Sequence, residues 1–143
     1  MSRATKYEYN NVGELTQVDY PSDTDVIYGL DNLGRMTSRV DSAGTWIWTY
    51  QDQSSRVLSE SLFVPSLTSV LSVVNYSYSS NTFELAKVSL DSSHYTEYFW
   101  SMGRLTNVVS VCGEITNSFS YSYVPNSDLL SGISNLIFEI TRA

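Results

Sequence analysis

The amino-acid sequence predicts an all-β fold, an antiparallel meander of β-hairpins that forms a curved sheet or a partial barrel. Two observations carry this prediction. The first is the composition, with 11 tyrosines, 13% aromatic residues and only 16% charged residues. Tyr, Val, Thr and Trp suit half-buried pleated surfaces, whereas a helical bundle needs Ala, Leu, Glu and Lys. The second is an aromatic–turn–apolar pattern that recurs along nearly the whole chain.

Length and charge limit the classes of partner. The 143 residues predict a single β-repeat domain over residues 1–143. A net charge of −7 without a basic stripe argues against nucleic acid and against anionic membrane surfaces. No apolar run reaches the roughly 18 residues of a spanning helix, so no membrane insertion is expected. Residues 1–11 show no apolar segment of a secretory signal, and the residues alone leave the localisation open.

Six segments of the chain repeat one pattern: two aromatic or apolar residues two positions apart, a turn, a charged residue and a closing apolar residue. The segments Tyr7 to Leu15 and Tyr28 to Met36 show it well. The closing residues stand at positions 15, 36, 57, 85, 105 and 129, at spacings of 21, 21, 28, 20 and 24. The repeats are expected near residues 7–20, 28–40, 49–62, 76–90, 97–111 and 121–133, followed by an apolar tail at 134–143.

Each repeat is predicted to form a strand, a turn and a second strand. Tyr7 and Tyr9 alternate with polar residues, so both rings fall on one face of a strand. The residues from Asn10 to Gly13 then supply turn chemistry, because Asn side chains bond to nearby amides and Gly adopts positive φ freely. The other repeats follow the same pattern and give roughly a dozen short strands without a helix.

Charged residues occupy fixed places in the turns. Asp31 and Arg35 face each other across the second turn, and the third turn repeats this relation. Arg104 holds the same place in the fifth repeat, where Trp100 stands at the Asp position and offers its ring for a cation–π contact. Because the pattern recurs from repeat to repeat, we interpret these residues as turn-closing pairs rather than as a row of ligand-binding cations.

These segments resemble the YD repeat of the Rhs family, whose typical form is Tyr-x-Tyr-Asp-x-x-Gly-Arg-Leu. The resemblance covers about residues 7–132, and the segments 28–36 and 98–105 match the Gly-Arg-Leu end best. The chain departs from the pattern where Glu14 and Asp128 replace the Arg and where Ser55 replaces the Gly.

The resemblance implies both a fold and a function. Similar repeats wind into a spiralling β-sheet that encloses a hollow shell in bacterial polymorphic toxins, insecticidal toxin complexes, wall-associated proteins and teneurins. The repeats there are scaffold, around a toxin cargo or for surface adhesion. The resemblance therefore implies a non-catalytic structural module, a segment of such a shell or a stand-alone copy, that is secreted or on the cell surface.

Sheet edges predict the partners. A six-hairpin meander that does not close leaves two edges with unpaired amides and carbonyls, and repeat arrays need polar caps at both ends. The segment from Leu136 to Ile140 carries no charge except Glu139. The sheet therefore either curls into a closed barrel or pairs through its edges with other repeats or a second chain, and we favour a curved open sheet.

Aromatic side chains support an alternative function. Trp46 and Trp48 share one strand face, and Trp100 follows two further aromatic residues. Exposed rings on a sheet stack on sugars, so the alternative is a carbohydrate- or protein-binding β module that uses these three tryptophans. Cross-strand aromatic ladders, worth about 0.5–1.5 kcal/mol a pair, explain the same rings without a ligand.

The sequence nominates no catalytic residue, cofactor or metal. His94, the single histidine, lies in a loop beside Asp91 and Ser93, and triads are assembled from separate elements rather than from sequence neighbours. Cys112 follows a valine-rich strand and is expected to be a buried, inert thiol. Asp23 and Asp25 lack the third acid that calcium prefers. An enzyme is therefore not expected.

Overall fold

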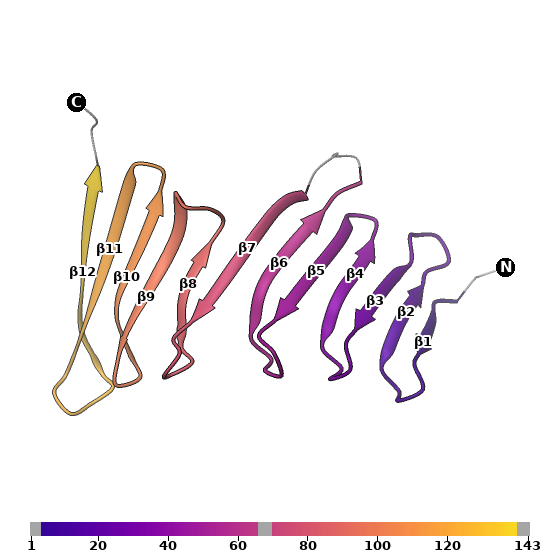
Figure 1. Ribbon diagram of the computed structural model, residues 1–143, viewed down its shortest axis with the longest axis horizontal. Helices are drawn as coiled ribbons and strands as arrows, with labels where there is room; N and C mark the ends of the chain where they lie inside the picture. Colours follow the sequence, from indigo (N-terminus) through magenta and orange to yellow (C-terminus); the bar gives the residue numbers. More distant parts are fainter. Residues whose placement is uncertain (1–3, 66–69, 140–143) are drawn as a thin grey trace. The chain divides into compact units, whose positions relative to one another are not determined.

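The structure, a computed structural model, describes residues 4–65 and 70–139, and these residues are all-β (Figure 1). Within them, twelve strands follow one another in the sheet in sequence order, β1 to β12. The strand pairs are antiparallel in each of the six hairpins and at the junctions β2–β3, β4–β5, β8–β9 and β10–β11. The antiparallel meander that the sequence predicts is thus confirmed. In the described residues β1 and β12 each have one neighbouring strand, so the order does not close into a barrel.

The chain divides into two compact units between Val73 and Val74, within β7. The first unit holds β1 (Lys6–Tyr9), β2 (Leu15–Asp19), β3 (Val26–Leu30), β4 (Met36–Asp41), β5 (Gly44–Tyr50) and β6 (Val57–Phe63). The second holds the greater part of β7 (Val70–Tyr78), then β8 (Leu85–Ser89), β9 (His94–Ser101), β10 (Arg104–Cys112), β11 (Ile115–Tyr123) and β12 (Leu130–Glu139). Residues 134–139, expected as an apolar tail, continue the last strand.

Every hairpin carries the same irregularity beside its turn. The register shifts by one residue next to the turn in all six hairpins, so that the residue before the turn pairs with the closing apolar residue. These pairs are Tyr9↔Leu15, Leu30↔Met36, Tyr50↔Val57, Tyr78↔Leu85, Trp100↔Leu105 and Tyr123↔Leu130. The shared register shows that the sequence repeats are structural repeats.

Three details of the predicted alignment are wrong. Asp52 does not hold the position of Asp31, because the third turn is one residue longer than the second and it is the amide of Gln51 that donates to the carbonyl of Arg56. The sixth closing residue is Leu130 rather than Leu129, because the sixth turn is one residue longer than the second. Trp100 does not hold the Asp position, because the fifth turn is shorter and Ser101 already pairs with Arg104. Trp100 instead holds the position of Tyr50 and Tyr123, because it pairs with the closing residue of its own hairpin, Leu105.

Turns are closed as their side chains predict. In the second turn the amide of Asp31 donates to the carbonyl of Arg35 at 2.9 Å. The Asp31 carboxylate in turn accepts from the amides of Leu33 and Arg35, at 2.9 and 3.0 Å. Gly34 completes the turn at φ +74°, a conformation that costs a residue without Cβ little. Local side-chain chemistry therefore sets where the second hairpin reverses.

Little of either unit is buried. Among the described residues, Val18 and Val26, facing one another across β2 and β3, are the buried hydrophobic side chains, at 4% and 9% exposure. Aromatic and aliphatic side chains along the other strands are half-buried or exposed. Each unit is therefore a single layer of sheet, and contacts between neighbouring strands rather than a covered core hold it together.

Candidate functional site at the junctions between repeats

Arg35 is fixed first within its own turn. It stands in the slot position, which we define as the residue directly before the closing apolar residue. Its Nε donates to Asp31 Oδ2 at 2.6 Å, and its Nη2 lies 2.6 Å from the same oxygen. Its side chain is 19% exposed. The ion pair predicted across this turn is confirmed, and it aims the guanidinium away from its own strand.

The same guanidinium reaches the next hairpin. Arg35 Nη1 donates to the carbonyl oxygen of Asp52 at 2.7 Å and to that of Ser54. Its Cζ lies 4.6 Å from the ring centroid of Tyr50, which is cation–π distance. The Tyr50 hydroxyl donates back to the carbonyl oxygen of Met36 at 2.7 Å. We call this reciprocal set of contacts the junction clasp.

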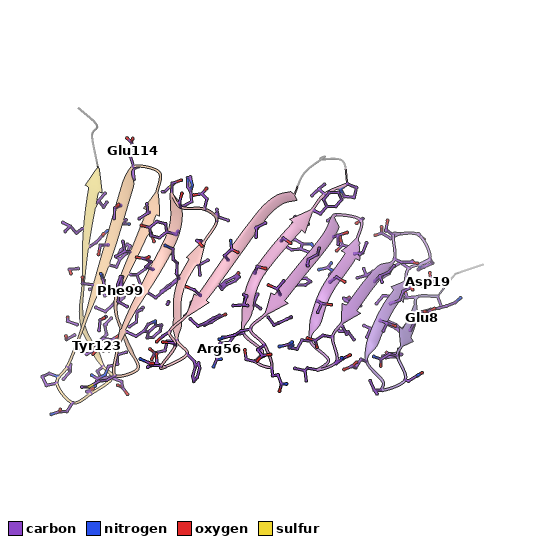
Figure 2. All side chains as sticks on the ribbon, in the orientation of Figure 1. Glu8, Asp19, Arg56, Phe99, Glu114 and Tyr123 are labelled. Carbon is purple, nitrogen blue, oxygen red and sulfur yellow. The ribbon has the colours of Figure 1, made fainter. Side chains whose placement is uncertain are left out.

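A second clasp with the same kinds of contact lies in the other unit. Arg104 Nη1 donates to the carbonyl oxygen of Ser127 at 2.7 Å, and its Cζ lies 5.6 Å from the ring centroid of Tyr123. Tyr123, labelled in Figure 2 at the turn end of β11, donates its hydroxyl to the carbonyl oxygen of Leu105 at 2.7 Å. Arg104 also pairs with Asp128 at 3.3 Å. The expected stacking of Arg104 on Trp100 is wrong, because its guanidinium points to the following hairpin.

Trp100 supplies the ring donor of another junction. Its Nε1 donates to the carbonyl oxygen of Leu85 at 2.8 Å. Leu85 is the closing residue of the fourth repeat, as Met36 is of the second and Leu105 of the fifth. The indole N–H of Trp100 thus takes the place of the tyrosine hydroxyl. The carbonyl oxygen of the preceding repeat's closing residue accepts its hydrogen bond, as in the two clasps.

Where the slot residue is a glutamate, its carboxylate lies beside a glycine in the turn of the next repeat. A Cβ built on Gly34 would lie 2.3 Å from Glu14 Oε1, and a Cβ built on Gly103 would lie 3.9 Å from Glu84 Oε1. Glu14 and Glu84 belong to the first and fourth repeats, and the two glycines belong to the turns of the second and fifth. Each of these slot residues therefore also reaches forward to the next turn, where an absent Cβ leaves room for the carboxylate.

The electrostatics of the clasp favour the ionised carboxylate. Partial desolvation raises the pKa of the Asp31 carboxyl, but hydrogen bonds from the Arg35 side chain and from the amides of Arg35 and Leu33 outweigh it. The net pKa lies below its ordinary value. Asp31 is therefore charged at neutral pH and holds the guanidinium in place.

The tryptophans nominated for ligand binding are divided between the two units. Trp46 and Trp48 are half-buried on one face of β5, with ring centroids 6.2 Å apart and planes 13° apart. Ile47 between them points to the opposite face and is exposed. Trp100 lies on β9 in the second unit and uses its N–H in the junction. Recognition of a sugar or protein by these rings stays a prediction.

His94 does contact an acid and a serine, but through one nitrogen. Nδ1 lies 3.0 Å from both Asp91 carboxylate oxygens and 3.3 Å from Ser93 Oγ. A proton relay needs the acid on one ring nitrogen and the nucleophile on the other. The Ser93 amide and hydroxyl and the His94 ring lower the pKa of Asp91 to about 2. The group acts as a turn cap in this geometry.

Cys112 is a surface residue, and Asp23 and Asp25 are bound by donors close to them in the sequence. The expectation of a buried Cys112 is wrong, because it ends β10 opposite His94 and is exposed. It lines a shallow hollow of about 500 Å³ together with aliphatic and hydroxyl side chains of the second unit. Asp23 accepts from the Thr24 amide, and Asp25 from Gln17 and the Tyr20 amide. In residues 4–65 and 70–139, no cluster of His, Cys, Asp and Glu is arranged to hold a metal.

The hydroxyl contacts of Tyr50 and Tyr123 were not anticipated from the sequence. The available signal was an aromatic residue at the same place in five of the six hairpins, where it pairs with the closing residue. Among the described residues there is also no helix long and apolar enough to cross a membrane.

Comparison with known proteins supports the fold. No family model matches the sequence, and no curated protein matches it. Among the solved structures, 27 chains match. One is a chain in the crystal structure of TcdB2-TccC3-Cdc42, which is similar to this chain with a TM-score of 0.73 and 14% sequence identity. The alignment covers 93% of this chain but 8% of that one, so the chain spans a small part of the length of the protein it matches.

Proposed function

We propose that this chain is a non-catalytic structural repeat module that forms a wall segment of a YD-repeat shell. The observation that carries the proposal is the match over 93% of the chain to a segment of a far longer protein in the TcdB2-TccC3-Cdc42 complex. The repeat pattern, which resembles that of shell-forming proteins in insecticidal toxin complexes, points the same way.

The distribution of polar contacts supports a scaffold. Arg35 and Arg104 donate hydrogen bonds to turn carbonyls of the following hairpin. Tyr50 and Tyr123 of that following hairpin donate their hydroxyls to carbonyls of the preceding one. Side chains used in this way fix one repeat on the next and are not available to a ligand. A module built from such junctions extends by adding hairpins, which is the property that a wall requires.

The single-layer sheet also suits a wall. A sheet with so few buried side chains leaves many large apolar residues partly exposed on its faces. Isolated soluble domains usually bury one sheet face against a second layer. In a shell the inner face borders an enclosed space or a cargo. We therefore propose enclosure of a cargo or surface interaction as the finer function, in a secreted or cell-surface protein.

A tandem protein tests this proposal. Three copies of the full chain are joined in frame, with a protease-sensitive reporter protein after the last copy, and the product is examined by electron microscopy. We expect a continuous curved ribbon and slower digestion of the reporter than of the same reporter after one copy. The matched control carries Arg35→Met and Arg104→Met in every copy and should lose both properties. Separate beads on a string, with a reporter that is digested at the single-copy rate, would refute the wall function.

A further inference from the structure

We propose that two copies of this chain dock head to tail, with β12 of one copy pairing with β1 of the next and Tyr9 forming the junction clasp between them. The proposal rests on the proposed function in one respect, that repeats are joined through their strand edges. It adds a named partner, a second copy, and a named contact.

The four junctions whose pairing the described residues show join the same two kinds of strand. The returning strand of one hairpin pairs with the opening strand of the next, as β2 pairs with β3, β4 with β5, β8 with β9 and β10 with β11. In the described residues, β1 is an opening strand without a returning strand beside it, and β12 is a returning strand without an opening strand beside it. The two free edges are therefore of complementary kinds. Pairing β12 with β1 of another copy repeats an internal junction.

Tyr9 stands at the position that supplies the ring donor in the clasps of Tyr50 and Tyr123. It pairs with its own closing residue directly before the turn, which is the place that Tyr50 and Tyr123 hold in their hairpins. Those two rings are half-buried and their hydroxyls are bound, whereas Tyr9 is 59% exposed and its hydroxyl has no hydrogen-bond partner within the described residues. Within the described residues, Tyr9 therefore holds a clasp position whose hydroxyl is not bound.

Leu130 offers the matching acceptor at the other edge. It is the sixth closing residue, equivalent to Met36 and Leu105, whose carbonyl oxygens accept from the tyrosines of the next hairpin. In a head-to-tail pair the Leu130 carbonyl accepts the Tyr9 hydroxyl of the next copy.

The side chains of β12 favour pairing over solvent exposure. Ile133, Leu136 and Ile137 are all exposed by more than half, whereas Val108 and Val109 in β10, which has strands on both sides, are half-buried. Residues 130–137 carry no charge. Edge strands that stay unpaired are usually protected by charges or by proline. The long uncharged edge therefore fits a strand partner.

The residue in the sixth slot position means that the proposed contact between copies has only part of a complete clasp. It holds Leu129, which is 70% exposed, where Arg35 and Arg104 stand in complete clasps. A head-to-tail junction of two native copies therefore has the tyrosine hydrogen bond but no guanidinium over the ring. Replacing Leu129 by Arg should supply the missing half.

Sedimentation velocity of the full chain, from low to high micromolar concentration, tests the proposal. We expect association that proceeds beyond a dimer, because a head-to-tail contact leaves a free edge at each end. Tyr9→Phe should weaken it about tenfold and Leu129→Arg should tighten it about tenfold, each equal to about 1.4 kcal/mol. Tyr7→Phe, on the same strand but outside the clasp position, is the matched control and should leave association unchanged.

The association of the double variant and the largest mass that the native chain reaches decide whether the proposal holds. Tyr9→Phe together with Leu129→Arg should lose the gain from the arginine only in part, because a phenylalanine ring still accepts a cation. A chain that stays monomeric, association that stops at a dimer, or association insensitive to both substitutions would overturn the proposal. The covalent tandem described above reports on the wall function independently, since its copies are joined by peptide bonds.

Discussion

Removing the Arg35 guanidinium should open the junction that it closes. Arg35→Met keeps most of the aliphatic stem but removes two hydrogen bonds to turn carbonyls and the cation–π contact with Tyr50. Each of these three contacts is worth about 0.5–1 kcal/mol at a partly exposed site. The substitution should therefore lower the free energy of opening of this junction by about 2 kcal/mol, without counting the ion pair to Asp31.

Hydrogen exchange followed by mass spectrometry measures this effect locally. A loss of about 2 kcal/mol corresponds to about 30-fold faster exchange of the amides in β5 and the turn after it. Lys6→Met is the control, because Lys6 forms an exposed ion pair with Asp19 at 3.9 Å that contributes little. Peptides from β9 to β12 should exchange at the native rate in both variants, since they belong to the other unit.

A double-mutant cycle tests the reciprocity of the clasp. Tyr50→Phe removes the hydroxyl and leaves the Met36 carbonyl without its donor, so it should speed exchange by itself by about 3- to 10-fold. Combined with Arg35→Met, the effects should fall short of additivity, because both side chains hold the same junction. If Arg35→Met exchanged no faster than Lys6→Met, or if the two clasp variants were fully additive, the clasp would not be a cooperative unit.

Three further predictions concern other parts of the chain. In thermal unfolding, Gly44→Ala should lower the free energy of unfolding by roughly 2–4 kcal/mol, because φ is +145° and a Cβ would lie 2.3 Å from a β6 carbonyl oxygen. Gly13→Ala should lower it by only about 1 kcal/mol, because φ is +87° but the space around the new Cβ is open. Because the pKa of Asp91 is lowered, its contribution to the stability of the turn is complete above pH 3.8 and is lost as the pH falls to about 2. An NMR titration of the Asp91 carboxyl should therefore give a midpoint near 2, and a midpoint near 4 would contradict its role as a turn cap. Sugars that bind the Trp46–Trp48 pair should change tryptophan fluorescence in the native chain but not in a Trp46→Ala, Trp48→Ala variant, and no response across a glycan panel would reject the binding alternative.

Local residue patterns were sufficient to predict the hairpins. The alternation around Tyr7 and Tyr9 and the Asn and Gly residues that follow act over fewer than ten residues, so strand, turn and return strand can be recognised without knowing any distant contact. The resemblance to YD repeats and the all-β meander depend on the same short segments. Errors arose where turn length varies, because a longer sixth turn moves the closing position to Leu130 and a shorter fifth turn moves Trp100 out of the Asp position.

The amino-acid sequence by itself determined the class of fold, the number of repeats and the place of an arginine and an aromatic residue in them. Only the tertiary structure decided what those residues hold. The clasp contacts of Arg35, Tyr50, Arg104 and Tyr123 join residues 14 to 23 positions apart, in different hairpins. Their partners are mostly backbone carbonyls, which every residue has and no side-chain pattern marks. For that reason the arginines were expected to close their own turns, whereas Arg35 also fastens the second repeat to the third and Arg104 fastens the fifth to the sixth.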